Sequence, residues 1–160
     1  MTLQKQVYEK QAAGVIGELA DTSPKRVAPY IVKANSDVKP SIGCAYTLSD
    51  KEHELTIGGS GAFVGVAVGP KQYVTDTLES SLLLKDGAIA QICSMGHVYV
   101  TSKTAVTPGN IAAFDPANGQ IYAYADASAA TTAKHTVIPN AKFVFCEADA
   151  NGTAILELNS

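Results

Sequence analysis

Short apolar runs separated by turn signals make up most of the chain. Residues 106–125 show the pattern most clearly: a Pro-Gly pair opens an apolar run, an Asp-Pro-Ala-Asn-Gly turn follows, and residues 120–125 then alternate with period two. This combination is typical of a β-hairpin. Asp86-Gly87, between apolar residues 82–84 and 88–93, indicates a second hairpin, and Asn151-Gly152 indicates a turn before the last apolar run.

The whole pattern predicts roughly ten short strands with turns every 8–12 residues, which is typical of sandwiches and barrels. Gly96 separates two expected strands, 88–93 and 97–101, and residues 126–134 form an expected loop. We therefore expect an all-β fold, an antiparallel sandwich, jelly-roll or Greek-key barrel with a short irregular N-terminal segment. One domain spans residues 1–160, with residues 1–20 as a possible extended arm. The other expected strands are 27–33, 42–48, 55–57, 63–68, the two arms of the 108–125 hairpin, 135–138, 141–146 and 153–158; residues 71–81 fit a short helix or a loop.

Charge is sparse in this sequence. Charged residues make up 17% of the 160 residues against a usual ~25%, hydrophobic residues make up 46%, and the net charge is −3. So few charges imply that part of the surface is neutral and is covered by a partner. No concentrated basic stretch is present, which predicts that the protein binds neither nucleic acid nor a membrane surface. The polar N-terminal residues are not a signal peptide, so we expect synthesis in the cytoplasm.

Candidate metal, cofactor and redox residues lack the spacing that these functions need. Cys44, Cys93 and Cys146 contain no Cys-x-x-Cys pair, so we expect free thiols and no disulfide. His53 stands among carboxylates, but neighbouring residues of an extended chain point to opposite faces. The Gly-rich residues 58–62 lack the Lys-Ser/Thr ending of a phosphate loop, and a strand follows them. We expect no metal site and no cofactor.

Catalytic candidates are equally sparse. Strand alternation places His97, Tyr99 and Thr101 on one face, but no serine or cysteine nucleophile motif accompanies the histidine. We therefore expect no enzyme activity and a polar outer or interface face. Tyr122 and Tyr124 form one aromatic face of their strand, which fits either the core or a subunit- or sugar-binding surface.

Six stretches in a fixed order carry a family resemblance over nearly the whole chain: residues 14–26, 61–73, 86–96, 108–119, 138–143 and 154–158. In that order the sequence resembles the structural cement, or head decoration, proteins of tailed bacteriophages. The resemblance implies a non-enzymatic virion protein that binds the outer capsid surface and locks neighbouring major capsid subunits together. The alternatives are a tail or baseplate β-domain, a carbohydrate-binding module or adhesin, and a small β-barrel enzyme.

Candidate contacts with the capsid or a second subunit lie mainly near the N-terminus. Residues 15–30 are apolar but are interrupted by Gly and Pro, so they make a poor interior strand, and a partner could complete their backbone hydrogen bonds. The alternative is that this region folds back on its own sheet. The expected partners are the major capsid protein and the protein itself, as a dimer or trimer. The candidate contact residues are Val15, Ile16, Leu19, Lys25, Arg26, Tyr30, Tyr122 and Tyr124.

Overall fold

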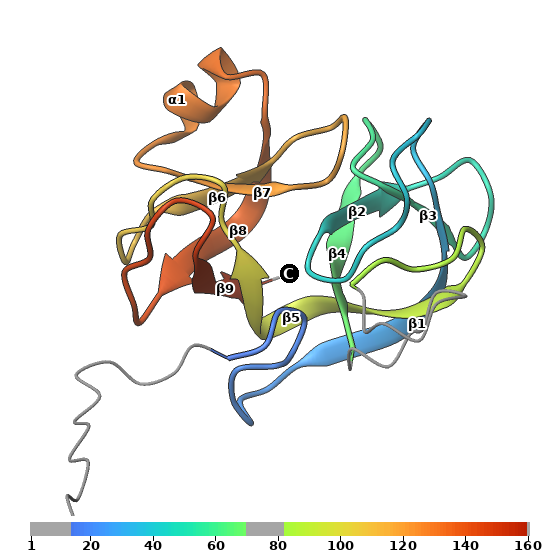
Figure 1. The fold of residues 1–160 in the computed structure, drawn as a ribbon, viewed down its shortest axis with the longest axis horizontal. Coiled ribbons are helices and arrows are strands. Elements are labelled where there is room, and N and C mark those ends of the chain that lie inside the picture. Colours follow the sequence, from blue (N-terminus) through green and yellow to red (C-terminus); the bar gives the residue numbers. More distant parts are fainter. Residues whose placement is uncertain (1–13, 70–81, 160) are drawn as a thin grey trace, which may run out of the picture.

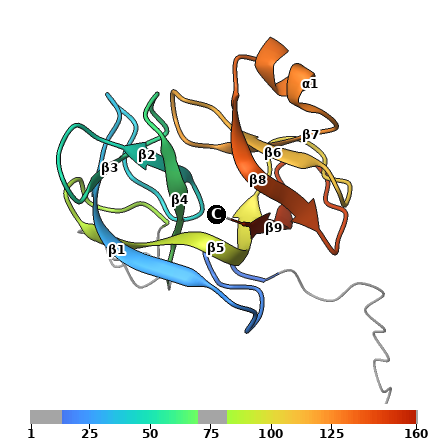
Figure 2. The same ribbon diagram turned by 180° about the vertical axis from the view of Figure 1, so that it is seen from behind.

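The computed structural model describes residues 14–69 and 82–159. Within these residues nine strands and one short helix form two lobes that share one strand, as Figure 1 and the reverse view in Figure 2 show. The mostly β content confirms the expected all-β class. The elements are β1 (Arg26–Lys33), β2 (Ala45–Leu48), β3 (Glu54–Ile57), β4 (Phe63–Val68), β5 (Ile89–Thr101), β6 (Ile111–Phe114), β7 (Ile121–Tyr124), α1 (Ala127–Thr132), β8 (Thr136–Val144) and β9 (Thr153–Leu158).

The first lobe, here called the barrel lobe, contains β1 to β4 and the first half of β5. Its strands follow the order β1-β3-β2-β4-β5, and β5 also pairs with β1, which closes the sheet on itself. Inside the closed sheet lie buried side chains including Val32, Tyr46 and Leu55. β1 and β3 are parallel. The expectation of a wholly antiparallel sheet is wrong for this pair, because the turn signals that suggested it describe only neighbouring strands.

β5 joins the lobes. Residues 89–95 pair with β1 and β4, and residues 96–101 pair with β9. The change of partners falls at Gly96, whose φ is +130°. A Cβ at Gly96 would lie 3.1 Å from the Cβ of Lys25. The expected break at Gly96 is therefore wrong: glycine bends a continuous strand of 13 residues here and does not end it.

The second lobe contains the second half of β5 with β6 to β9 and α1. Its strands are antiparallel neighbours in the order β5-β9-β8-β6-β7, which agrees with the antiparallel arrangement that the sequence predicts. Beyond β5, the Lys103 N–H donates to the Ile121 carbonyl at 2.9 Å, and the Thr104 hydroxyl bonds both backbone groups of Ala123. These contacts occupy the outer edge of β7. The sequence predicted two strands at 135–138 and 141–146, but β8 is one strand, with Asn140 at φ +53°.

One expected loop contains a helix. Residues 126–134 include α1, whose N-cap residue Asp126 accepts a hydrogen bond from the Ala129 N–H at 2.9 Å. The prediction was wrong because an Asp N-cap followed by alanines is a good local start for a helix, even a six-residue one. The expectations for residues 1–13 and 71–81 lie outside the described residues.

The larger hydrophobic cluster lies between the lobes. It combines residues from the barrel strands, such as Val66, with Phe114, Phe143 and Leu156 of the second lobe. The rings of Phe63 and Phe114 lie 6.0 Å apart across this boundary. Burial shared in this way makes the two lobes one packed unit.

The tip of the β6–β7 hairpin adds backbone contacts between the lobes. The Ala45 N–H donates to the Gly119 carbonyl at 2.8 Å, and the Gly59 N–H donates to the Pro116 carbonyl at 2.7 Å. The Asn35 side-chain amide also donates to Pro116, at 3.0 Å. The hairpin that was the clearest signal in the sequence therefore fixes the second lobe on the barrel lobe.

Candidate functional site

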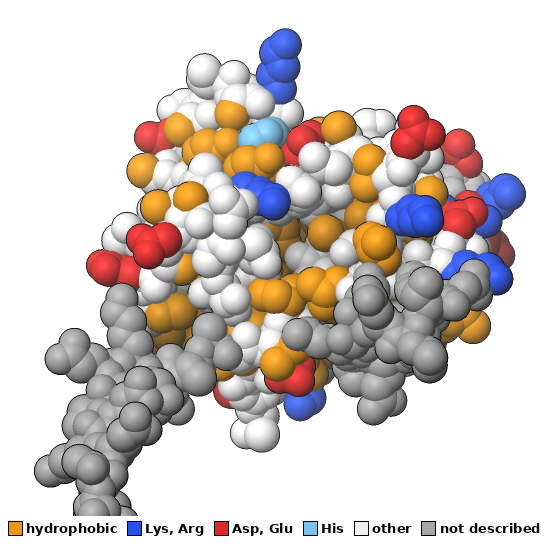
Figure 3. Space-filling view, in the orientation of Figure 1, with side chains coloured by type: hydrophobic (Ala, Val, Ile, Leu, Met, Phe, Trp, Pro, Cys, Tyr) orange, Lys and Arg blue, Asp and Glu red, His pale blue; other side chains and the backbone are white. Residues whose placement is uncertain are grey.

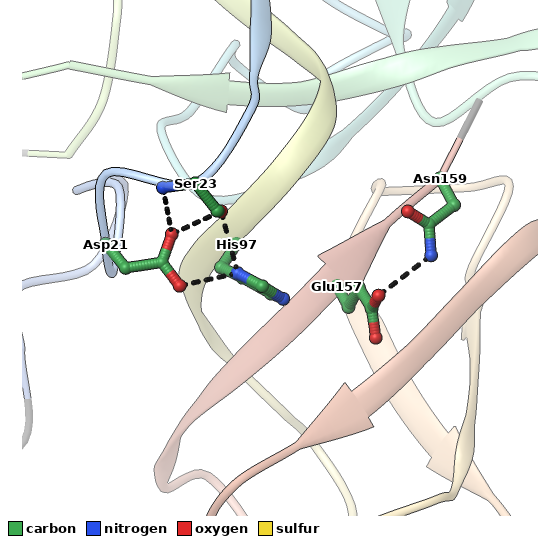
Figure 4. Close-up of polar contacts among 5 residues, drawn as sticks. All are labelled: Asp21, Ser23, His97, Glu157 and Asn159. Carbon is green, nitrogen blue, oxygen red and sulfur yellow. Dashed lines mark hydrogen bonds and ion pairs between the residues drawn. The ribbon is translucent and has the colours of Figure 1, made fainter.

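A polar cluster forms where the N-terminal segment crosses β5. His97 lies on β5, and its Nδ1 is 2.7 Å from Asp21 Oδ2 and 3.1 Å from Ser23 Oγ (Figure 4). The Ser23 hydroxyl also donates to Asp21. Hydrogen bonds from Ser23, with a smaller contribution from His97, hold the pKa of Asp21 below its usual value. Strand alternation places the His97 side chain on the outer face, as the sequence predicted.

This combination of Asp, His and Ser does not have the geometry of a catalytic triad. A triad places the carboxylate on Nδ1 and the serine on Nε2, so that the imidazole can take the serine proton. Here both Asp21 and Ser23 contact Nδ1, and the serine hydroxyl is bonded to the carboxylate. The arrangement attaches residues 21–23 to β5 and does not activate a nucleophile.

Backbone hydrogen bonds attach the preceding residues to the same strand. The Gly17 N–H donates to the Tyr99 carbonyl at 2.8 Å, and the Ala20 N–H donates to the His97 carbonyl at 2.8 Å. In return, the Tyr99 N–H donates to the Glu18 carbonyl at 3.0 Å. Residues 17–20 therefore run along the edge of β5 that β9 leaves open, in the fold-back arrangement that the sequence left as the alternative.

The candidate contact residues near the N-terminus occupy different environments. Val15, Ile16 and Leu19 are half-buried, and Leu19 packs against the larger hydrophobic cluster. Ile16 lines a small hollow of about 150 Å³ at the lobe boundary, together with Cys44 and Lys103. Desolvation in this region raises the pKa of the Cys44 thiol to about 11.

The remaining candidates in this part of the chain lie at or near the start of β1. Lys25 and Arg26 are exposed, and Arg26 lies opposite Met95 of β5. Tyr30 is half-buried and packs against the barrel core. The structure therefore does not bring the sequence-predicted residues together on one patch.

Tyr122 and Tyr124 form a second cluster with His135. The two tyrosine rings are nearly parallel, at 17° and 6.4 Å, and the His135 ring lies 4.1 Å from that of Tyr122. The Tyr124 hydroxyl is 2.6 Å from His135 Nδ1. Burial, and then the charge of Asp115, raises the pKa of Tyr122. Ile121 and Ala123 face the core, so the tyrosines lie on the outer face and not in the core.

Phe145 was missed by the sequence analysis. It is 71% exposed, the highest exposure among the large hydrophobic residues that the structure describes. Its ring edge contacts His97, with centroids 5.3 Å apart at 66°. Alternation along the expected strand 141–146 would place Phe145 on the same buried face as Phe143. The strand ends at Val144 instead, so the sequence carried no signal for an exposed ring.

The wider surface offers little chemistry. Figure 3 shows that the centre of the displayed face, between the lobes, is a mixture of hydrophobic and other uncharged atoms, and that most Lys, Arg, Asp and Glu side chains lie toward its outline. Among residues 14–69 and 82–159, no group of three metal-ligating side chains converges, and no helix is long and apolar enough to cross a membrane. Cys44, Cys93 and Cys146 are all free thiols in the structure.

The described residues form an all-β domain with a largely uncharged displayed face. Comparison with protein families matches residues 3–159 to the family described as structural cement protein (E217 gp24/Pam3 gp6). Because this match spans nearly the whole chain, the protein belongs to the phage structural cement family. The resemblance seen in the sequence is confirmed, and the chain is a non-enzymatic structural virion protein that stabilises the phage head.

Similarity to a solved capsid structure supports the fold. A chain in the structure titled "The capsid of Myoviridae Phage XM1" superposes with a TM-score of 0.64 at 16% identity, covering 100% of this chain and 99% of that chain. The N base of head fiber gp8.5 in bacteriophage phi29 gives a TM-score of 0.46 at 14% identity, covering 84% of this chain and 95% of that chain. No curated protein matches the sequence. At 16% identity, the XM1 likeness shows a shared fold.

Proposed function

We propose that the protein binds the outer surface of the assembled capsid as a single domain and bridges neighbouring major capsid subunits. The observation that carries this proposal is the largely uncharged face between the lobes (Figure 3), in a protein with 17% charged residues. Burying such a face on a partner costs little desolvation of charge. On a capsid, where each contact is repeated many times, individually modest contacts add by avidity.

The joined lobes suit this role mechanically. A protein that bridges two subunits transmits load only if its own parts do not slide past one another. The shared strand β5, the cluster around Phe114 and the hairpin tip bonded to Ala45 all couple the lobes. Internal DNA pressure pulling two capsid subunits apart would therefore act on a packed core and not on a linker.

The proposal includes self-association as a dimer or trimer, since a protein that bridges symmetry-related subunits can repeat its own contacts by the same symmetry. The candidate contacts on the described surface are Lys25 and Arg26 at the start of β1, and Tyr122 and Tyr124 on the outer face of β7. Leu19 packs mainly within the protein, so its role is support. The net charge of −3 favours a protein surface over nucleic acid or a membrane as the partner, and synthesis in the host cytoplasm is part of the proposal.

Cosedimentation with undecorated capsids tests the proposal. Wild-type protein should pellet with capsids at a saturable ratio and should raise the temperature at which the capsids break, while linear DNA and lipid vesicles should not pellet it. Light scattering of the free protein should show a dimer or trimer. Failure to pellet with intact, undecorated capsids would contradict outer-surface binding, and a strictly monomeric mass at high concentration would contradict self-association.

Two N-terminal deletions separate an arm from a structural segment. Removing residues 1–13 leaves every described contact in place. Removing residues 1–20 also removes the hydrogen bonds between residues 17–20 and β5. If residues 1–13 contact the capsid, both deletions should weaken binding while circular dichroism shows retained β structure after the shorter one. If the shorter deletion decorates capsids normally, that contact is not made.

A further inference from the structure

We propose that Phe145 is an aromatic anchor that inserts into an apolar pocket with a basic rim on the major capsid protein. This inference rests on the proposed capsid binding and names the contact that makes it. None of the candidate contact residues named from the sequence lies on the turn that presents Phe145.

The backbone at Phe145 holds the side chain outward at a conformational cost. The Cys146 N–H donates to the Val144 carbonyl at 2.9 Å, which closes a three-residue turn, and Phe145 at its centre has φ +67°. Such γ-turns are rare and strained, and a bulky residue at positive φ is unusual. A chain that needed only a turn here would be served better by glycine or asparagine.

Packing within the protein does not account for the aromatic ring. Phe145 is 71% exposed, while Phe143, two residues earlier, is fully buried. The Phe145 ring lies edge-on to the ring of His97, with centroids 5.3 Å apart. Strained conformations persist where the surrounding structure enforces them, and they gather at binding sites. An exposed, strained phenylalanine is therefore better explained by a contact outside the chain.

His97 holds the ring in place before any partner arrives. Its imidazole is fixed by Asp21 and Ser23, and the backbone of His97 is paired on both sides, with the N-terminal segment and with β9. An aromatic side chain that is already oriented loses little conformational freedom on binding, which raises affinity. Aromatic residues are enriched at interfaces, and a few such residues carry most of the binding energy.

The charges around the ring indicate the chemistry of the partner. Glu147 follows two residues later and is exposed. Glu157 lies directly opposite His97 in the β5–β9 register, on the same side as Asp21, and Lys142 contacts Glu157 at 3.8 Å. The charged groups named here, the three carboxylates of Asp21, Glu147 and Glu157 and the ammonium group of Lys142, sum to a net negative charge. Arginine or lysine side chains around the receiving pocket would complement it.

The test compares capsid affinities of single variants. Phe145→Ala and Phe145→Gly should weaken binding about 30-fold or more, the range of a strong interface residue. Phe145→Trp should stay within a few-fold of wild type. Ile89→Ala is the matched control, because Ile89 is also a large exposed hydrophobic residue, at 65%, but lies in the barrel lobe. It should bind like wild type.

The melting temperature provides a second measurement. If Phe145 served the stability of the fold, its replacement should lower the melting temperature, whereas an anchor for a partner predicts no loss. Phe145→Gly relieves the positive φ, so its melting temperature should equal or exceed that of wild type even though binding is lost. Binding by wild type should also weaken as salt rises, because the patch is acidic.

The outcomes distinguish a failure of the Phe145 proposal from a failure of the proposed capsid binding. If wild type decorates capsids and Phe145→Ala decorates them equally well, the anchor is overturned and capsid binding stands. If wild type itself does not bind, the proposed function fails first. If Phe145→Ala leaves capsid binding intact but lowers the mass measured by light scattering, the pocket belongs to a second copy, which also overturns the assignment to the capsid protein. Binding that is insensitive to salt would contradict the basic rim.

Discussion

The two lobes close their sheets by different routes. In the barrel lobe, β1 pairs with β3 in parallel and with β5 in antiparallel, so closure depends on strands that are distant in the sequence. In the second lobe all pairs between the named strands are antiparallel, a hairpin joins β6 to β7, and one parallel bridge links Ser102, just beyond β5, with Ile121 of β7. Local turn chemistry therefore describes the second lobe well and the barrel lobe poorly, because no short-range signal specifies a parallel pair.

The lobes also differ in how they bury their side chains. The barrel lobe encloses its own cluster, which includes Tyr46, Leu55 and Ile92. The second lobe has no separate cluster among the described residues: its buried side chains join those of the barrel strands in the larger cluster. We infer that the second lobe requires the barrel lobe for its stability, whereas the barrel retains a core of its own.

The largest effect should come from Phe114→Ala, which removes a fully buried ring from the cluster that both lobes share. We expect the free energy of unfolding to fall by about 3–5 kcal/mol. Calorimetry of wild type should show one transition, with calorimetric and van't Hoff enthalpies in agreement. Two separate transitions in wild type would mean that the shared cluster does not couple the lobes.

Leu55→Ala provides the matched measurement inside the barrel. Its side chain is also fully buried, and the expected loss is about 2–5 kcal/mol. If the second lobe depends on the barrel, each variant should unfold in a single thermal transition at a lower temperature than wild type. A Leu55→Ala protein that lost barrel structure while the β6–β9 sheet remained protected from hydrogen exchange would reverse the dependence inferred above.

Gly96→Ala tests the point at which β5 passes between the lobes. Alanine at φ +130° is strained, and its Cβ would be close to that of Lys25. We expect a loss of about 2 kcal/mol in urea titrations followed by circular dichroism. Gly109→Ala is the control, since Gly109 also has positive φ but has nothing within 4 Å of an added Cβ. An equal loss for both variants would show that the loss of stability comes from the backbone conformation alone and not from the close approach of the new Cβ to Lys25.

Thr104→Val should have a smaller effect, confined to the second lobe. The Thr104 hydroxyl donates to the Ala123 carbonyl and accepts from the Ala123 N–H, both at 2.8 Å. Valine keeps the shape but leaves two backbone groups on β7 without these partners, so we expect a loss of about 1–2 kcal/mol. Hydrogen exchange should quicken at Ala123. The same substitution at exposed Thr107 should change neither quantity, and a matching loss there would assign the effect to valine itself.

The positions of the strands could be predicted from the sequence better than the way the strands pair. The strands at 63–68 and 153–158 were predicted with their exact bounds, and the strand at 27–33 to within a residue, because alternation and flanking Gly or Pro residues mark them. The pairing of β1 with β3 and β5 could not be predicted, since contacts between distant residues leave no local pattern. The polar cluster could not be predicted for the same reason, since Asp21 and His97 are 76 residues apart. The exposure of Phe145 could not be predicted because a turn with positive φ interrupts the strand alternation there.

The smallest effect should be at the cap of α1, the helix that the sequence did not predict. Hydrogen bonds from Ser128 and from the Ala129 N–H hold the pKa of Asp126 below its usual value. A carboxyl group whose pKa is lowered by folding stabilises the protein fully above its unfolded pKa, near 4, and this contribution is lost as pH falls through the folded pKa. Asn also caps helices but does not titrate.

The melting temperature of wild type should therefore exceed that of Asp126→Asn at pH 7, and the difference should shrink below pH 4. Asp126→Ala, which removes the cap at every pH, should melt below both at pH 7. A wild-type advantage that grew on acidification would contradict the ionised carboxylate as the cap, and the short helix would then be held by its packing through Ala130 alone.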